Sequence, residues 1–229
     1  MAIAAPQEKP IQIALGQLPK SHVAEYRKGE LIYSVRQPPD RVYLVTDGTV
    51  MVSRIVNDEK QVVMDICQPP EIFGESALIN SVARDEQALA LENTKVMSWT
   101  ATEIVDNVTR QTRLGMSLLQ MLAVRESELT WRMESLAVDT IHLRVARSLI
   151  RLSGRLGTAQ SDGSVRMPPL THKLLSQYVG STREIVTHHM TEFRKMGYLT
   201  YSRSGIVVYR EALMEWLQRN SPGRFDAFS

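Results

Sequence analysis

Four polar side chains between residues 183 and 188 have the types and spacing that read the edges of base pairs. Arg183 can donate two hydrogen bonds to one guanine, and the carboxylate of Glu184 can accept one from a cytosine amino group. Thr187 and His188 follow one helical turn later, and an imidazole can donate to a base or a phosphate. At the start of a helix these side chains would project together into a major groove of DNA.

The residues around them predict a helix-turn-helix that would hold this surface. Thr171 is a good N-cap for a first helix, and Gly180 can take the positive φ of a tight turn. Ser181 and Glu184 have the spacing of a capping box, so we expect the second helix from about Thr182 to Met196.

A short hairpin is expected after the second helix. Two apolar runs, 198–201 and 206–209, flank the polar turn at 202–205 and predict a two-stranded wing. Basic residues on the wing and at the start of the first helix are expected to contact phosphates. The predicted DNA-contacting residues are Thr171, Lys173, Thr182, Arg183, Glu184, Thr187, His188 and Arg203.

Charge is distributed unevenly along the chain. Residues 1–137 hold 14 Lys and Arg against 18 Asp and Glu, whereas residues 138–229 hold 13 against 7. A basic module attached to an acidic one is expected when only one end meets a polyanion. The charge pattern therefore favours DNA as the partner of the C-terminal part.

The first part of the chain predicts an all-β domain. Residues 26–99 contain short runs rich in Val, Ile, Tyr and Leu, separated by turn residues about every ten positions. Asp47-Gly48 lies between two alternating runs, 41–45 and 49–56, and predicts a hairpin. Strands of this length usually close into a barrel or a sandwich.

From Ala101 the hydrophobic period becomes helical, and we expect a long helix. Five apolar residues fall on a and d positions of a heptad, interrupted once by Glu126, while charged residues such as Arg125 decorate the other faces. So narrow a stripe suits a seam between two copies of the chain, although a helix packed only on its own domain is the alternative. The predicted dimerisation residues are Leu119, Leu122, Leu129, Met133 and Leu136.

Composition excludes several kinds of site. Cys67 is the single cysteine, which leaves no disulfide framework and no iron–sulfur cluster held by four thiolates. Residues 1–10 lack the apolar core of a signal peptide and no long apolar stretch follows, so we expect a cytoplasmic protein. No histidine lies within 26–99, and the neighbours His188 and His189 lack the spacing of a metal pair. We therefore expect no metal site and no enzyme.

Seven segments carry a family resemblance: YRKGE at 26–30, VYLV at 42–45, DG at 47–48, IFGESAL at 72–78, LA at 136–137 with the helix after it, VGSTREIV at 179–186 and IVVY at 206–209. In order and spacing they resemble the Crp/Fnr family of transcription regulators, that of the cyclic-AMP receptor protein and the fumarate and nitrate regulator. The resemblance implies a homodimer that reads a two-fold DNA site and acts on RNA polymerase. His188 stands where the family usually has an arginine, which predicts a different base preference there.

The fold class implied is α+β: an N-terminal cyclic-nucleotide-binding-like β-roll (a double-stranded jelly roll), a long dimerisation helix and a C-terminal winged helix-turn-helix. The implied domains are 1–105 for the sensor, 106–137 for the dimerisation helix and 138–229 for DNA binding.

The resemblance also points to an effector site in the β-roll, with a departure. In the family an arginine at the position of Arg84 holds a cyclic phosphate, but here Asp85 follows it instead of a hydroxyl residue. A carboxylate about 4 Å from a phosphate costs on the order of 4 kcal/mol at an effective dielectric near 20, unless alternation along the chain turns it to the opposite face. The candidate effector residues are Gly74, Glu75, Ser76, Arg84, Asp85 and Thr130.

The effector itself stays open at this point. Cyclic AMP is disfavoured by Asp85, and a haem would have only Cys67 or His22 as unaccompanied axial ligands. The remaining hypotheses are no ligand, or a ligand such as a cyclic dinucleotide, whose guanine edges suit carboxylates. The alternative function is an activator responsive to a cyclic nucleotide or cyclic dinucleotide, and a winged helix that binds only protein is a further alternative.

Overall fold

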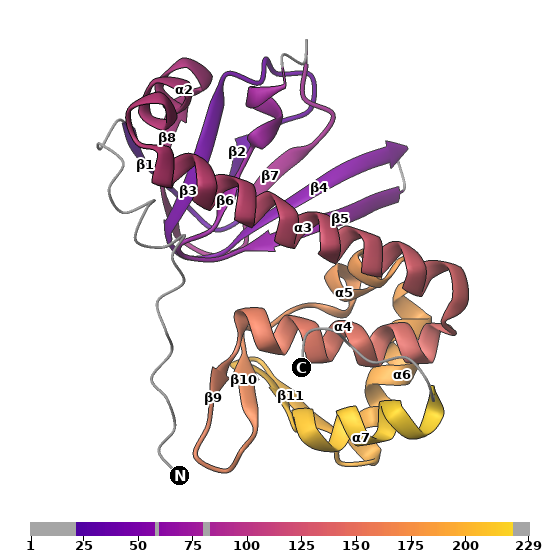
Figure 1. Cartoon of the computed structure of the whole chain (residues 1–229). Helices are drawn as coiled ribbons and strands as arrows, with labels where there is room; N and C mark the ends of the chain where they lie inside the picture. The colour runs from indigo at the N-terminus through magenta and orange to yellow at the C-terminus, as the bar shows by residue number, and fades with distance from the viewer. Residues whose placement is uncertain (1–21, 58–59, 80–82, 222–229) are drawn as a thin grey trace. The chain divides into compact units, whose positions relative to one another are not determined.

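The computed structural model describes residues 22–57, 60–79 and 83–221, and it divides into two compact units at Thr130 and Trp131. Figure 1 shows the strand-rich first unit and the helix-rich second unit, each of which is described by itself. The long helix α3 (Thr112–Val138) belongs to the first unit up to Thr130 and to the second beyond it.

The first unit is built from two antiparallel sheets with the strand orders β1-β8-β3-β6 and β2-β7-β4-β5. The first sheet consists of β1 (His22–Tyr26), β8 (Thr94–Thr100), β3 (Arg41–Asp47) and β6 (Ile72–Phe73). The second sheet consists of β2 (Leu31–Tyr33), β7 (Gln87–Ala90), β4 (Val50–Asn57) and β5 (Lys60–Cys67). This is the β-roll expected from the sequence, and a short 3-10 helix, η1 (Glu75–Leu78), follows β6.

The hairpin expected at Asp47-Gly48 is wrong, because β3 and β4 lie in different sheets. Gly48 has a φ of 84°, and a Cβ added there would lie 2.6 Å from the carbonyl oxygen of Asn93. The turn is therefore a tight corner that carries the chain from one sheet to the other. The hairpin forms instead between β4 and β5, where Asn57 lies opposite Lys60.

Strand β3 shows how alternation builds two cores. Tyr43 and Val45 point into the cluster between the sheets, whereas Val42 and Leu44 belong to a second cluster that α2 (Ala101–Arg110) and α3 cover. Successive side chains of a strand face opposite ways, so a strand that is apolar at every position must be covered on both faces.

The predicted long helix is interrupted near its start. A capping box between Thr100 and Glu103 begins α2, and the backbone leaves the helical region at Gln111, with φ −132° and ψ 87°. The helix expected at 106–137 is therefore the end of α2, a break and α3.

The second unit consists of helices and a four-stranded sheet. Its helices are α4 (Ile141–Leu156), α5 (His172–Val179), α6 (Arg183–Lys195) and α7 (Arg210–Asn220). The sheet has the order β11-β12-β10-β9, formed by β9 (Thr158–Ala159), β10 (Val165–Met167), β11 (Leu199–Ser202) and β12 (Gly205–Val208). The wing is confirmed by β11 and β12. The stretch 154–169, although rich in turn residues, contains the two short strands β9 and β10.

Among the helices formed by the described residues, none is both long and apolar enough to cross a bilayer.

Candidate DNA-binding surface and effector site

The turn between α5 and α6 is defined by backbone hydrogen bonds. Thr171 caps α5 by accepting from the amide of Leu174 at 3.1 Å, as its sequence position predicts. Gly180 has a φ of 74°, and its amide and that of Ser181 both donate to the carbonyl of Ser176. Ser176 is buried, which its small side chain allows at the crossing of the two helices.

The capping box assigned to Ser181 is wrong. The amide of Ser181 closes the end of α5, so the next residue, Thr182, becomes the N-cap of α6 and accepts from the amide of Ile185 at 3.4 Å. Glu184 instead lies in the first turn of α6, where hydrogen bonds from its own amide and from the Thr182 hydroxyl lower the pKa of its carboxyl. An ionised carboxylate also suits the positive end of the helix dipole.

The predicted base-reading residues occupy one exposed surface. Thr182, Arg183 and Glu184 are exposed at the start of α6, and the side chain of His188 is 67% exposed one turn later. Thr187 is half-buried, because its hydroxyl hydrogen-bonds with His172 Nδ1 at 2.9 Å.

The predicted phosphate-contacting residues lie in the same unit. Thr171 and Lys173 are exposed at the start of α5, and Arg203 is exposed in the turn of the wing. Tyr201 of the wing packs edge-on against the His172 ring, with centroids 5.2 Å apart. The wing is therefore in contact with the helix-turn-helix.

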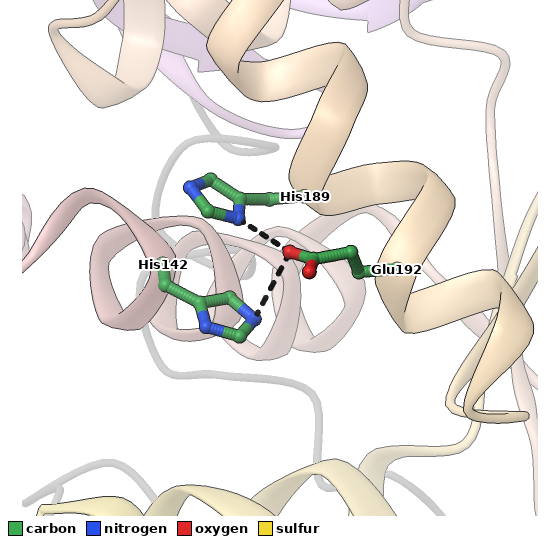
Figure 2. A group of neighbouring side chains, drawn as sticks. All are labelled: His142, His189 and Glu192. Atoms are coloured by element: carbon green, nitrogen blue, oxygen red, sulfur yellow. Dashed lines mark hydrogen bonds and ion pairs between the residues drawn. The ribbon is translucent and has the colours of Figure 1, made fainter.

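A second set of polar side chains in this unit was missed by sequence reasoning. His142 of α4 lies beside His189 and Glu192 of α6, and their potential metal-ligating atoms all lie within 4.8 Å of one another (Figure 2). Burial is the main reason that the pKa of His142 is lowered. The spacing of His188 and His189 gave no sign of this cluster, because its third member comes from a helix some 50 residues earlier in the chain.

In the β-roll, Arg84 is buried, and both terminal nitrogens of its guanidinium donate hydrogen bonds to neighbours. Its Nη1 donates to the Ser76 hydroxyl at 2.9 Å, and its Nη2 donates to the carbonyl of Arg41 at 2.7 Å. The guanidinium carbon lies 3.9 Å from the centre of the Tyr33 ring. Gly74 lies beside this cluster with a φ of 79°, and a Cβ added there would lie 3.4 Å from Arg84 Nη1.

The carboxylate that faces Arg84 is Glu86. Asp85 is 64% exposed and pairs with Arg54 at 2.6 Å, so it points away from the buried Arg84, as the alternation argument allows. Glu86 Oε1 lies 3.8 Å from Arg84 Nη1 and accepts a hydrogen bond from the Tyr33 hydroxyl at 2.9 Å. Burial is the main reason that the pKa of Glu86 is raised, and Glu75 and Asp85 raise it further.

Glu75 is held by Arg125, a residue that sequence reasoning placed on a charged outer face of the helix. That interpretation is wrong: the side chain of Arg125 is only 16% exposed. It donates to Glu75 at 2.6 Å, lies 3.6 Å from Asp65 and also donates to the carbonyl of Ile72. The signal was present in the sequence, because Arg125 continues an apolar helical stripe that packs on the roll, formed by Leu114, Leu118 and Met121.

Thr130 is not brought to this cluster. It is exposed, and its hydroxyl donates to Glu126 at 3.0 Å one turn earlier on α3. The structure therefore brings together Gly74, Ser76 and Arg84, with Glu75 held by Arg125, and leaves Asp85 and Thr130 outside.

Two family models match the chain. A cyclic nucleotide-binding domain matches residues 23–110, and a Crp-like helix-turn-helix domain matches residues 143–216. A CRP-like cAMP-activated global transcriptional regulator of Mycobacterium tuberculosis is 24% identical, over 80% of this chain and 82% of the relative.

Solved structures share the fold of this chain. FixK2 from Bradyrhizobium japonicum has a TM-score of 0.73 and 24% identity, covering 85% of this chain and 96% of that one. The c-di-GMP responsive global regulator CLP of Xanthomonas campestris has a TM-score of 0.72 and 19% identity, covering 86% of this chain and 98% of that one. These matches follow the order of the two units described above. The chain therefore belongs to the Crp/Fnr family of transcription regulators and is not an enzyme.

Proposed function

We propose that the protein is a cytoplasmic homodimeric transcription regulator that reads a palindromic DNA site and acts on RNA polymerase. The observation that carries this proposal is the exposed surface of α6, where Arg183, Glu184 and His188 project at the start of a capped helix. Their donors and acceptors match base edges, and the wing and the start of α5 add groups that can hold phosphates.

The two apolar stripes of α3 support a dimer. One stripe packs on the β-roll, as a helix that contacts only its own domain would. That packing does not account for the second stripe. The predicted seam residues form a different stripe and are 40% to 69% exposed in a single chain, far more than their apolar side chains favour. A second copy would cover them. The seam residues are Leu119, Leu122, Leu129, Met133 and Leu136.

The base-reading role of Arg183 gives the direct test. We expect Arg183→Ala to lower affinity for a duplex selected from a random library by about 1 to 3 kcal/mol and to relax preference at one base pair of each half-site. Fluorescence anisotropy against single-substitution duplexes measures both effects. Arg219→Ala, on the exposed face of α7, is the matched control and should change neither. Unchanged selectivity of the Arg183 variant would remove this residue from base reading.

For the β-roll, we propose either no effector or one other than cyclic AMP. The support is that both charged groups expected to hold a cyclic nucleotide already have internal partners: Arg84 faces Glu86, and Glu75 is paired with Arg125. A cyclic phosphate at Arg84 would have to displace or neutralise a carboxylate.

A cyclic dinucleotide is the second candidate, since CLP, which has the same fold, is named for its response to c-di-GMP. Calorimetric titration of the purified protein with cyclic AMP, cyclic GMP and cyclic di-GMP distinguishes the candidates. Micromolar binding of cyclic AMP at neutral pH would contradict the proposal. Binding of cyclic di-GMP alone would select the second candidate.

A further inference from the structure

Three side chains from two helices converge outside the surface that would read DNA. Glu192 Oε2 lies 2.9 Å from His189 Nδ1 and 4.0 Å from His142 Nε2, and Figure 2 shows both imidazoles turned toward this carboxylate. His142 comes from α4, whereas His189 and Glu192 lie one turn apart on α6.

These separations are close to those of a metal site. With Zn–N and Zn–O bonds of about 2.0 to 2.2 Å, tetrahedral ligand atoms lie about 3.3 to 3.6 Å apart. The ligand atoms here all fall within 4.8 Å of one another, so shifts of about an ångström would bring them to one ion. The two imidazole rings are stacked 13° from parallel, and one must turn for both lone pairs to converge. The His189 ring can supply this turn, because the terminal torsion of an imidazole has broad energy minima.

One ring nitrogen of His142 makes no hydrogen bond to the described residues. Its Nε2 is buried from solvent and makes no hydrogen bond within the described chain. The ring is fixed by packing against Phe193 and Trp216, with centroids 4.7 Å away in each case. A buried polar atom without a hydrogen bond is costly, so a nitrogen held in place toward a carboxylate indicates a missing ligand.

The side chains around Glu192 are of the kind found around a metal-binding carboxylate, not of the kind found in a structural salt bridge. In the described part of the chain its recorded ion-pair partners are imidazoles: His142, His188 and His189. Arg and Lys are the usual partners of a structural carboxylate, whereas neutral imidazoles together with a carboxylate are the ligands of zinc.

We propose that His142, His189 and Glu192 bind a divalent transition metal ion of the zinc type and so join α4 to the recognition helix α6. Water completes the fourth position. The bound ion would hold the Glu192 carboxylate and release His188, which lies 3.4 Å from it, to face DNA. This consequence for DNA rests on the proposed function, whereas the affinity for zinc does not.

The test is titration of the untagged, chelator-treated full chain with Zn²⁺ by calorimetry and with Co²⁺ by visible absorption. We expect one equivalent of Zn²⁺ per chain and Co²⁺ bands of tetrahedral intensity. Glu192→Gln and His189→Gln should each lower Zn²⁺ affinity by at least about 100-fold, since loss of mere supporting groups already costs 10- to 100-fold. His22→Gln, at an exposed histidine of β1, is the matched control and should bind as the parent does.

Two outcomes would overturn the site: no Zn²⁺ binding by the parent protein, or equal binding by the parent, Glu192→Gln and His189→Gln. Circular dichroism melting in chelator shows that each variant is folded, and Glu192→Gln is conservative at a partly exposed position. DNA affinity is measured separately with and without Zn²⁺, and we expect Zn²⁺ to strengthen it several-fold in the parent but not in Glu192→Gln. Failure of DNA binding with zinc binding intact would contradict the proposed function and leave the metal site standing.

Discussion

A single carboxylate faces the arginine that was expected to hold an anionic ligand in the β-roll. The sequence places Asp85 beside Arg84, and that made the aspartate the natural opponent of an anionic ligand. In the structure Asp85 pairs with Arg54, and Glu86 takes the inward position beside Tyr33. Neighbours in sequence thus have opposite surroundings, and the carboxylate that faces Arg84 belongs to a residue two positions further along the chain.

The first prediction concerns Glu86. We expect Glu86→Gln to raise affinity for cyclic AMP by at least about tenfold at neutral pH, because a carboxylate about 4 Å from a phosphate costs on the order of 4 kcal/mol. The pKa of Glu86 is raised, so the folded protein keeps its proton above the ordinary value of 4.5. Binding of the anion by the parent should therefore weaken as pH rises through that range, and the variant should lose this dependence.

Calorimetric titration at several pH values measures both effects. Asp85→Asn is the matched control, since Asp85 is exposed and points away from Arg84. Equal affinities of the parent and Glu86→Gln at every pH would show that Glu86 does not oppose the ligand.

Between the long helix and the DNA-binding unit lies a junction held by a buried ion pair. Asp139 follows the end of α3, and its carboxylate lies 3.1 Å from Arg147 Nε of α4, with both side chains at most 3% exposed. The Ser135 hydroxyl donates to the same carboxylate at 2.6 Å, and Thr140 caps α4. Within the second unit, the turn from the end of α3 into α4 is thus held by hydrogen bonds and charge.

The second prediction tests this junction. We expect Asp139→Ala to lower the free energy of unfolding by about 3 to 5 kcal/mol, because it leaves the Arg147 guanidinium buried without its carboxylate. Urea denaturation followed by circular dichroism measures the loss. Asp106→Ala, at an exposed aspartate of α2, should cost less than about 0.5 kcal/mol. Equal midpoints for the two variants would show that the pair contributes nothing to the fold.

Elements with strong local signals could be predicted from the sequence, and those defined by distant neighbours could not. Gly180 and Thr171 specify their turn and cap through their own backbone chemistry, so the helix-turn-helix was predictable. The Asp47-Gly48 turn was recognisable, but which sheet the next strand enters depends on its pairing with β5 and β7, which lie further along the chain. Ser181 had the spacing of a cap, yet its amide is used by α5.

The same limit applies to the candidate sites. The exposed reading surface of α6 follows from one short segment, whereas Arg125 reaches Glu75 across 50 positions of the chain and His142 meets Glu192 from another helix. Such long-range pairings leave only a faint pattern in sequence, as in the stripe that Arg125 shares with Met121.

For the whole molecule, the proposed dimer rests on the exposed stripe of α3. We expect Leu129→Glu to shift the protein to a monomer in analytical ultracentrifugation, because two copies would bring like charges into an apolar seam. Affinity for a palindromic duplex should fall at least tenfold, since one chain holds one half-site. Val105→Glu changes an equally exposed aliphatic residue of α2 and should leave the dimer intact. A Leu129→Glu protein that stays dimeric would place the seam elsewhere.

The central claim is that two copies of α6 enter duplex DNA together, and footprinting on a selected duplex tests it most directly. We predict two protected half-sites about 34 Å apart, and an affinity that falls steeply as salt concentration rises, because phosphate contacts release counterions. A single protected half-site would contradict the dimer. Affinity no greater than that of an unrelated acidic protein, at any salt concentration, would contradict the account as a whole.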